Sequence, residues 1–240
     1  MRSAEKKPSL VEEAYEKIRS KICDFELYPG QEVSDFTLCK ELGMSRTPVR
    51  QALVQLEYDG LVQDAGVGKS YKVSEITEKE ISDIFDAREA IEVNSLRLAM
   101  EKGIAPDQME TLERINLNME QQNAAGNIRL QFQYDQRFHN YLVELGGNQR
   151  LLRFYESLRM QLSRMRVLSY LESSYQEKAY NDHRSVLEEM KKGNRTQAMG
   201  RLTYHIRTSK KDYCDLLQNR VSLNSYGMLR FLMKNTEQRE

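Results

Sequence analysis

The stretch from Val33 to Gly60, VSDFTLCKELGMSRTPVRQALVQLEYDG, decides how the N-terminal part of the chain folds. Ser34 is a favourable N-cap for a short helix. Gly43 ends that helix, because glycine adopts the left-handed backbone conformation at little cost. Ser45 is expected to cap a further helix, whose first turn contains Pro48. The stretch therefore predicts two short helices joined by a tight turn.

The residues on either side of this stretch extend it into a larger unit. Apolar residues recur at helical spacing over 10–25 and predict a first helix, which a turn at Tyr28-Pro29-Gly30 is expected to end. Two short strand-like runs, 61–63 and 71–73, flank a glycine-rich tip at 64–69 and predict a β-hairpin. Three helices followed by a hairpin are typical of the winged helix-turn-helix.

The predicted third helix has two different faces. Its apolar stripe consists of Val49, Ala52, Leu53 and Leu56. The opposite face exposes Arg46, Thr47, Arg50 and Gln51, and no carboxylate occurs between Glu41 and Glu57. Such a helix N-terminus suits phosphates and guanine edges, and Lys69 at the hairpin tip is placed to reach the minor groove or backbone. An ordinary solvated face is the alternative, but the caps, the turn glycine and the hairpin together favour DNA binding.

From about residue 77 onward the sequence predicts long amphipathic helices. Thr77 and Glu80 form a capping box at the start of this part. The expected fold class is mainly α, with an N-terminal winged helix-turn-helix and a C-terminal all-helical bundle that can enclose a ligand. The expected divisions are a DNA-binding domain at 1–73, a linker at 74–77, a helical domain at 78–220 and a C-terminal extension at 221–240, in which 226–233 suggests an amphipathic helix.

The chain has only three histidines, His139, His183 and His205, each on a different predicted long helix. Asp135 lies four residues before His139, so the two side chains share one helix face. One carboxylate and three imidazoles that converged would form a divalent-metal site with open positions. The spacing alone does not establish convergence, because a single histidine on a helix also fits a core or a surface.

Composition limits the classes of protein that the chain can belong to. Lys plus Arg and Asp plus Glu both number 36, so any charge that attracts DNA must be local. No apolar run is long enough for a membrane span, and the N-terminus lacks the apolar stretch of a signal peptide. The three cysteines are widely spaced and form no CxxC pair, which fits a reducing cytosol. We therefore expect a cytoplasmic protein without a membrane partner.

The N-terminal motif resembles the DNA-binding domain of the GntR superfamily over nearly all of residues 10–73. The residues that carry this resemblance are those of 33–53, with Leu56-Glu57 and Gly60-Leu61-Val62. The resemblance implies contacts to bases, phosphates and the minor groove from Arg46, Arg50, Thr47 and the wing glycines Gly66 and Gly68. Gln51 departs from the family, which usually has Glu there, and its missing negative charge beside Arg50 is expected to alter operator preference.

The C-terminal part resembles the FCD ligand-binding domain over about 77–217. The resemblance rests on Phe85-Asp86-Ala87-Arg88-Glu89-Ala90-Ile91-Glu92, Asp135-x3-His139, Gly147-Asn148, His183 and His205. It implies that Asp135, His139, His183 and His205 bind Zn, Ni or a similar divalent ion. It also implies that this ion helps to hold a small carboxylate and that Arg88 lines the pocket. The residues after Leu217 depart from the usual end of that domain.

Motifs and resemblance together predict a metabolite-responsive transcription regulator, a repressor that a small carboxylate releases from DNA. We also expect a two-fold homodimer on a palindromic operator, because one module of this size reads only a few base pairs. A metal-responsive regulator is one alternative. A metal-dependent enzyme fused to a DNA-binding module is another, which is less favoured because no residue stands out as a general base.

Overall fold

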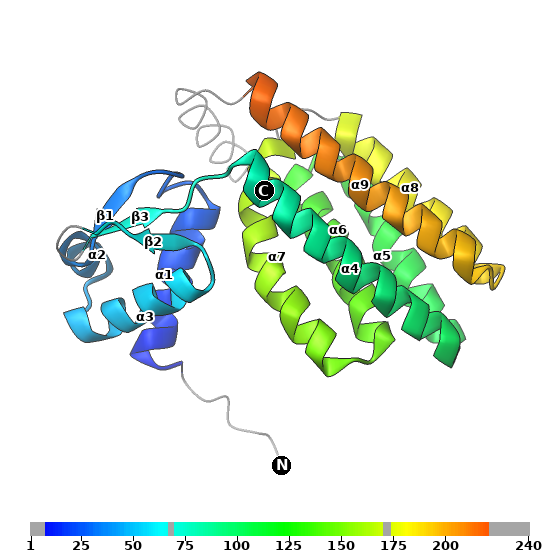
Figure 1. Ribbon diagram of the computed structural model, residues 1–240, viewed down its shortest axis with the longest axis horizontal. Coiled ribbons are helices and arrows are strands. Elements are labelled where there is room, and N and C mark those ends of the chain that lie inside the picture. Colours follow the sequence, from blue (N-terminus) through cyan, green and yellow to red (C-terminus); the bar gives the residue numbers. More distant parts are fainter. Residues whose placement is uncertain (1–7, 67–69, 170–173, 221–240) are drawn as a thin grey trace, which may run out of the picture. The chain divides into compact units, whose positions relative to one another are not determined.

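The computed structural model describes residues 8–66, 70–169 and 174–220. The elements of these ranges are α1 (Leu10–Cys23), β1 (Glu32–Ser34), α2 (Asp35–Leu42), α3 (Arg46–Tyr58), β2 (Val62–Asp64), β3 (Ser70–Val73), α4 (Glu78–Lys102), α5 (Pro106–Ala124), α6 (Ile128–Gly146), α7 (Gln149–Ser169), α8 (Ser174–Lys191) and α9 (Arg195–Arg220). They fall into two compact units, one that extends through Ile76 and one that starts at Thr77 (Figure 1). The extension expected at 221–240 lies outside the described residues.

The first unit combines three helices with a small antiparallel sheet, which confirms the winged helix-turn-helix part of the predicted fold class. The sheet has the order β1-β3-β2, and Val62 lies opposite Val73 in the hairpin. The sequence did not predict β1, in which Val33 pairs with Tyr71. With three residues, that strand is too short to show an alternating pattern.

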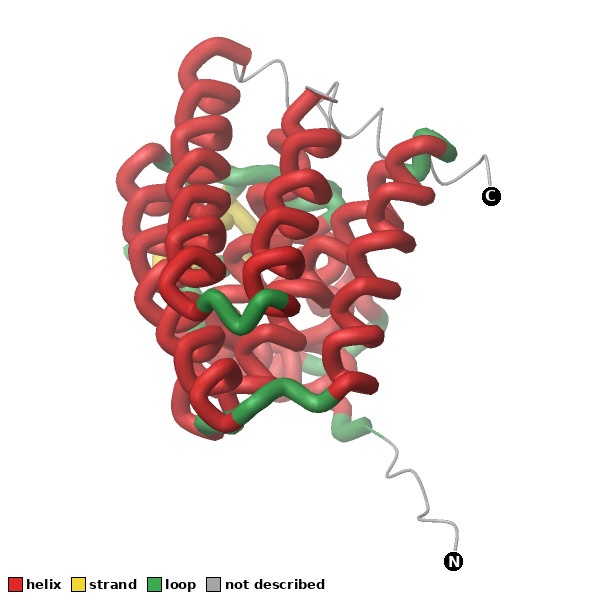
Figure 2. Tube along the Cα trace, turned by 90° about the vertical axis from the view of Figure 1, so that its right-hand side faces the viewer, coloured by secondary structure: helices red, strands yellow, loops and turns green. Residues whose placement is uncertain are grey.

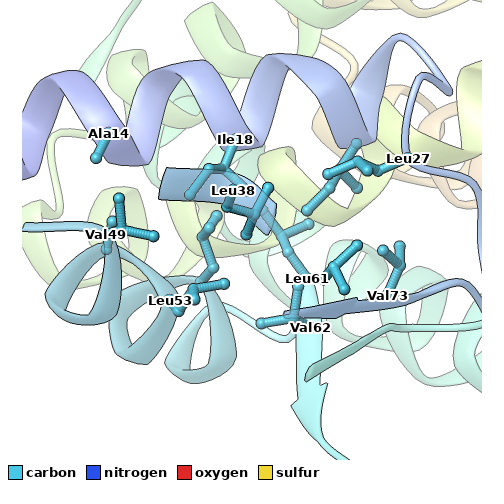
Figure 3. Packing of buried hydrophobic residues seen from close by; sticks show 13 residues of the cluster. Ala14, Ile18, Leu27, Leu38, Val49, Leu53, Leu61, Val62 and Val73 are labelled. Atoms are coloured by element: carbon cyan, nitrogen blue, oxygen red, sulfur yellow. The ribbon is translucent and has the colours of Figure 1, made fainter. Parts of the chain in front are cut away.

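The core of the first unit lies between the helices and the hairpin. In Figure 3 the side chains of Ala14 and Ile18 from α1 face Leu38 from α2 and Val49 and Leu53 from α3. The predicted apolar stripe of the third helix is confirmed, since Val49, Ala52, Leu53 and Leu56 are all fully buried. Burial of this stripe fixes which face of α3 stays in solvent.

Local signals set most helix ends in this unit. The Ser34 hydroxyl accepts a hydrogen bond from the Thr37 backbone N–H, and Gly43 adopts a φ of 65°. Ser45 precedes α3 as expected, but its side chain makes no capping hydrogen bond. The first helix is shorter than predicted and ends at Cys23, because Phe25 adopts a φ of 56° and buries its ring where the chain turns.

The second unit is a bundle of the helices α4 to α9, and this confirms the all-helical part of the predicted fold class. Figure 2 shows long helices that stand beside one another and are joined by short loops. α4 packs against α6, α7 and α9, while α8 packs against α5 and α9. Thr77 caps α4 by accepting a hydrogen bond from the Glu80 N–H. No helix in the described ranges is both long and apolar enough to cross a membrane.

Two helices of the bundle approach each other closely at Gly146, the last residue of α6. A Cβ atom at this position would lie 2.9 Å from both the Cα and the carbonyl oxygen of Ser95 on α4. The Lys102 ammonium group donates a hydrogen bond to the Gly146 carbonyl at 2.6 Å. Only a residue without a side chain fits this contact between α4 and α6.

We predict that Gly146→Ala lowers the free energy of unfolding of the full chain by about 1–3 kcal/mol, because the new methyl group must push the α4 backbone away. The matched control is Gly200→Ala in α9, where an added Cβ meets no atom within 4 Å. The control should raise stability by about 0.5–1 kcal/mol, since alanine loses less backbone entropy than glycine in a helix. Urea unfolding measures both, and equal effects of the two substitutions would contradict the close approach.

Candidate nucleic-acid interface and metal centre

The solvent face of α3 carries the side chains that the sequence assigns to DNA contacts. Arg46, Thr47 and Gln51 are exposed, and the first turn of the helix contains no acidic residue. The unpaired backbone N–H groups of a helix N-terminus attract anions. The exposed face of α3 and its N-terminus, which has no acidic residue, therefore form one surface that can accept a phosphate backbone.

Arg50 is less free than the sequence suggested. Its Nε donates a hydrogen bond to Asp35 Oδ2 at 2.6 Å, and the Asp35 side chain is only 7% exposed. The hydrogen bond from Arg50 holds the pKa of Asp35 below its ordinary value. Asp35 belongs to the first turn of α2, so the lack of carboxylates between Glu41 and Glu57 gave no sign of this partner. The ion pair fixes Arg50 against α2 before any DNA arrives.

The hairpin tip is only partly described. Gly66 has a φ of 71°, and its N–H donates a hydrogen bond to Asp64 Oδ1 at 2.8 Å. This local bond closes the turn after β2. Gly68 and Lys69, to which the sequence also assigned DNA contacts, lie outside the described residues.

The three histidines converge in the interior of the second unit. His139 comes from α6, His183 from α8 and His205 from α9, and all three are buried. Their Nε2 atoms lie 3.1 Å apart for His139 and His183, and 3.2 Å apart for each of the other two pairs. Asp135 Oδ1 lies 3.6 Å from His183 Nε2 and 3.8 Å from His139 Nε2. These four donor atoms all lie within 4.8 Å of one another.

Carboxylates on the outer side of the cluster fix the orientation of two of the rings. His139 Nδ1 lies 2.6 Å from Glu92 Oε2, and His205 Nδ1 lies 3.2 Å from Asp182 Oδ2. A carboxylate can only accept here, so each of these Nδ1 atoms carries a proton and each Nε2 presents a lone pair to the cluster. Sequence reasoning gave no role to Glu92 or Asp182, although Glu92 follows Arg88 by four residues and Asp182 directly precedes His183.

Glu92 is a fully buried carboxylate that joins two of these groups. Its Oε1 accepts a hydrogen bond from Arg88 Nε at 2.7 Å, while its Oε2 faces His139. Burial alone would raise the pKa of Glu92, but the charge of Arg88 and the hydrogen bonds from Arg88 and His139 lower it to about 2. Glu92 therefore stays ionised across the physiological range.

The cluster fits a divalent cation better than any arrangement of protons. Burial lowers the pKa of His183 well below its ordinary value, and the neighbouring His205 and His139 add to this effect. Burial also lowers the pKa of His205, against the opposing hydrogen bond to Asp182. Neutral imidazoles are the form that ligates metals. Nitrogen ligands lie about 2.1 Å from a bound ion. If two of them form a right angle at the ion, the two nitrogen atoms are about 3.0 Å apart, which is close to the spacing of the Nε2 atoms.

A cavity of about 80 Å³ opens beside the cluster. Its polar wall includes Asp135, His139, His205 and Arg88, the residue that the sequence assigned to the ligand pocket. Its apolar wall consists of Phe85, Met119, Ile128, Phe132, Leu162 and Leu216, with the buried Tyr155 beside them. The cavity thus places a cationic side chain and three of the four candidate metal ligands around one small space. The fourth, His183, does not line the cavity, but its Nε2 lies 3.1 Å from that of His139 and 3.2 Å from that of His205.

We predict that protein stripped of metal by a chelator loses stability as the pH falls below about 6.5. The folded state keeps His183 and His205 neutral, whereas the unfolded chain protonates them near the ordinary histidine pKa, so protons favour unfolding. The loss approaches about 1.4 kcal/mol per histidine for each pH unit. Denaturation followed at pH 7.5 and 5.5 measures it. His205→Gln should reduce this dependence on pH, and an unchanged unfolding midpoint in the native sequence would contradict the prediction.

Comparisons with family models and with individual proteins agree on one family. The model of bacterial regulatory proteins of the gntR family matches residues 10–68, and the FCD domain model matches residues 83–208. The chain is 27% identical to the HTH-type transcriptional regulator YdhC of Bacillus subtilis over 80% of its own length and 85% of that protein. It is 26% identical to the HTH-type transcriptional repressor RspR of Escherichia coli over 81% of its own length and 85% of that protein.

Among solved structures, Escherichia coli McbR/YncC has the same fold, with a TM-score of 0.72, 18% sequence identity and coverage of 90% of this chain and 100% of that one. The FCD model spans more than half of the 240 residues, and the gntR model covers most of the winged helix-turn-helix. The chain belongs to the GntR family of bacterial regulatory proteins, in the group that carries an FCD domain, and is a DNA-binding transcription regulator rather than an enzyme.

Proposed function

We propose that the protein is a repressor that leaves its operator when a small carboxylate binds in the cavity beside a divalent metal ion. The observation that carries this proposal is the convergence of Asp135, His139, His183 and His205 at one cavity. Arg88 and three of these four residues, all but His183, line that cavity. Four protein ligands leave open positions on a first-row ion with a mixed carboxylate and imidazole ligand set.

The charges around the cavity explain why an anion would need the metal. The charged residues on its wall cancel, because Arg88 and Arg159 stand against Asp135 and Asp212. A divalent ion adds positive charge and supplies a Lewis-acid centre for carboxylate oxygens. Arg88 already donates its Nε to Glu92, so its terminal nitrogens are the groups that would hydrogen-bond an anion.

The connection from the cavity to DNA runs along the chain. α4 lines the cavity with Phe85 and Arg88 and begins directly after the first unit. α7 lines the same cavity with Tyr155 and Leu162, and Arg164 on α7 forms an ion pair with Glu80 in the first turn of α4. A ligand that favours one arrangement of α4 and α7 shifts operator affinity by its difference in affinity for the two arrangements.

The proposed assembly is a homodimer in the cytoplasm on a palindromic operator. One winged helix-turn-helix reads few base pairs, and two-fold symmetry doubles the contacts. The repressor RspR, a relative of this chain, supports repression as the direction of control. In the proposed contacts, Arg46 and Arg50 reach bases and phosphates, Thr47 and Gln51 lie beside them, and the wing contributes Gly66, Gly68 and Lys69.

The two arginines of α3 should differ in what their loss does. Arg46→Ala and Arg50→Ala are each expected to weaken operator binding by about 1–3 kcal/mol. Arg50→Ala should also lower thermal stability, because it leaves the buried Asp35 without its partner, whereas Arg46→Ala should leave stability unchanged. Fluorescence anisotropy with a selected operator and thermal melts measure the two effects.

The control for these variants is Arg97→Ala, which removes an equal charge from an exposed ion pair in the helical unit. It should leave operator affinity unchanged. If both α3 variants bind the operator as tightly as this control, α3 is not the helix that reads DNA.

The metal prediction concerns His183 and His205 together. Changing both to Ala should abolish stoichiometric binding of Zn or Ni, because two of the four ligands are lost. Tyr204→Ala, an exposed position beside His205 on α9, is the control and should keep the metal. Elemental analysis of protein dialysed against each ion measures the content, and a double variant that retains one ion per chain would refute the site.

The same variants separate effector from metal sensing. Operator release is titrated with the metal alone and then with a panel of small organic acids in the presence of metal. The proposed function expects release only with an acid, and only in the protein that holds metal. Release by metal alone would make the ion itself the signal. Normal release of the double variant by an acid would leave the metal a structural role only.

A further inference from the structure

Phe36 occupies an unusual place for a large apolar side chain. It is the second residue of α2, follows Asp35 directly, and is 62% exposed. The guanidinium carbon of Arg46, at the start of α3, lies 5.9 Å from the centre of its ring. The exposed ring therefore lies within the surface from which α3 presents its arginines.

A single exposed apolar side chain needs no explanation by itself, since many occur on any protein surface. What sets Phe36 apart is its neighbour. Among the described residues, no hydrogen bond or ion pair engages the Arg46 guanidinium. The nearby carboxylate of Asp35 is already bonded to Arg50. The aromatic face thus supports Arg46 without using any of its five N–H donors.

The major groove offers matching partners for such a pair of side chains. Guanine presents O6 and N7 to an arginine, and thymine presents a C5-methyl group to an apolar side chain such as Phe. Successive bases along one strand are separated by about 3.4 Å. A ring 5.9 Å from the guanidinium is therefore one or two bases away from the guanine that Arg46 would bind.

We propose that Phe36 and Arg46 act together as one reading unit, in which Phe36 contacts the C5-methyl group of a thymine one or two positions from the guanine bound by Arg46. This inference rests on the proposed placement of α3 in the major groove. It makes α2, and not only the recognition helix, a determinant of operator sequence. Phe36 reads a methyl group and donates no hydrogen bond.

The test replaces single thymines by deoxyuridine, which lacks only the methyl group. Preferred duplexes are first selected from a random library with the full-length protein. Each thymine of the selected duplex is then changed to deoxyuridine, one at a time, and affinity is measured by anisotropy at fixed salt. We expect one thymine in each half-site whose replacement weakens binding about fourfold, the effect of losing one buried methyl group.

Phe36→Ala should make binding insensitive to deoxyuridine at that thymine and should remove the preference for thymine there in a new selection. Leu10→Ala is the matched control, because Leu10 is also 62% exposed in the same unit but lies on α1. It should keep the native sensitivity. Thermal melts of both variants check that they fold.

Two results would overturn the inference while leaving DNA binding by α3 intact. One is a native protein that binds every deoxyuridine duplex as tightly as the selected one. The other is a Phe36→Ala protein that remains sensitive at the same thymine, since another residue would then read the methyl group. Failure of the native protein to select any duplex would instead overturn the placement of α3 and the inference with it.

Discussion

The buried carboxylate of Glu92 orders the interior of the helical unit. It has no exposed surface, yet it stays ionised, because Arg88 and His139 both bond to it. A buried charge without partners would be strongly destabilising, so these three side chains must fold together. The contact between Glu92 and His139 joins α4 to α6, as does the close approach of Gly146 to Ser95. The hydrogen bond from His139 Nδ1 to Glu92 also determines that His139 Nε2 faces the histidine cluster.

The sequence predicted the local structure of the first unit well, because the deciding signals are short-range. Ser34 and Gly43 define α2 through contacts within four residues, and burial of the stripe on α3 then determines its exposed face. The predicted end of α1 was wrong. Phe25 adopts a left-handed backbone conformation and its ring is buried, and no local sequence signal indicated this. The Asp35–Arg50 ion pair was missed for a similar reason, because it joins two helices.

In the candidate metal centre, too, the sequence did not predict contacts between residues that are far apart along the chain. Spacing placed Asp135 and His139 on one face of α6, but nothing in the spacing brings His183 and His205 to that face. Only the resemblance to a family implied that the four side chains meet, and the structure does bring them together. The outer carboxylate partners Glu92 and Asp182 lie 47 and 23 residues along the chain from the histidines that they contact, so the sequence did not indicate these contacts. Their role depends on which ring nitrogen they face, and this is a property of the packed bundle.

The first turn of α2 has a consequence for how operator recognition can diverge between related regulators. Asp35 holds Arg50, and Phe36 lies beneath Arg46, so two adjacent residues of α2 set the poses of both arginines on α3. A descendant that kept every residue of α3 but changed this pair would present the same guanidinium groups at different angles. Related regulators with identical recognition helices therefore need not bind the same operators. Operator specificity can change by mutation of α2, which a comparison limited to the residues of α3 would ignore.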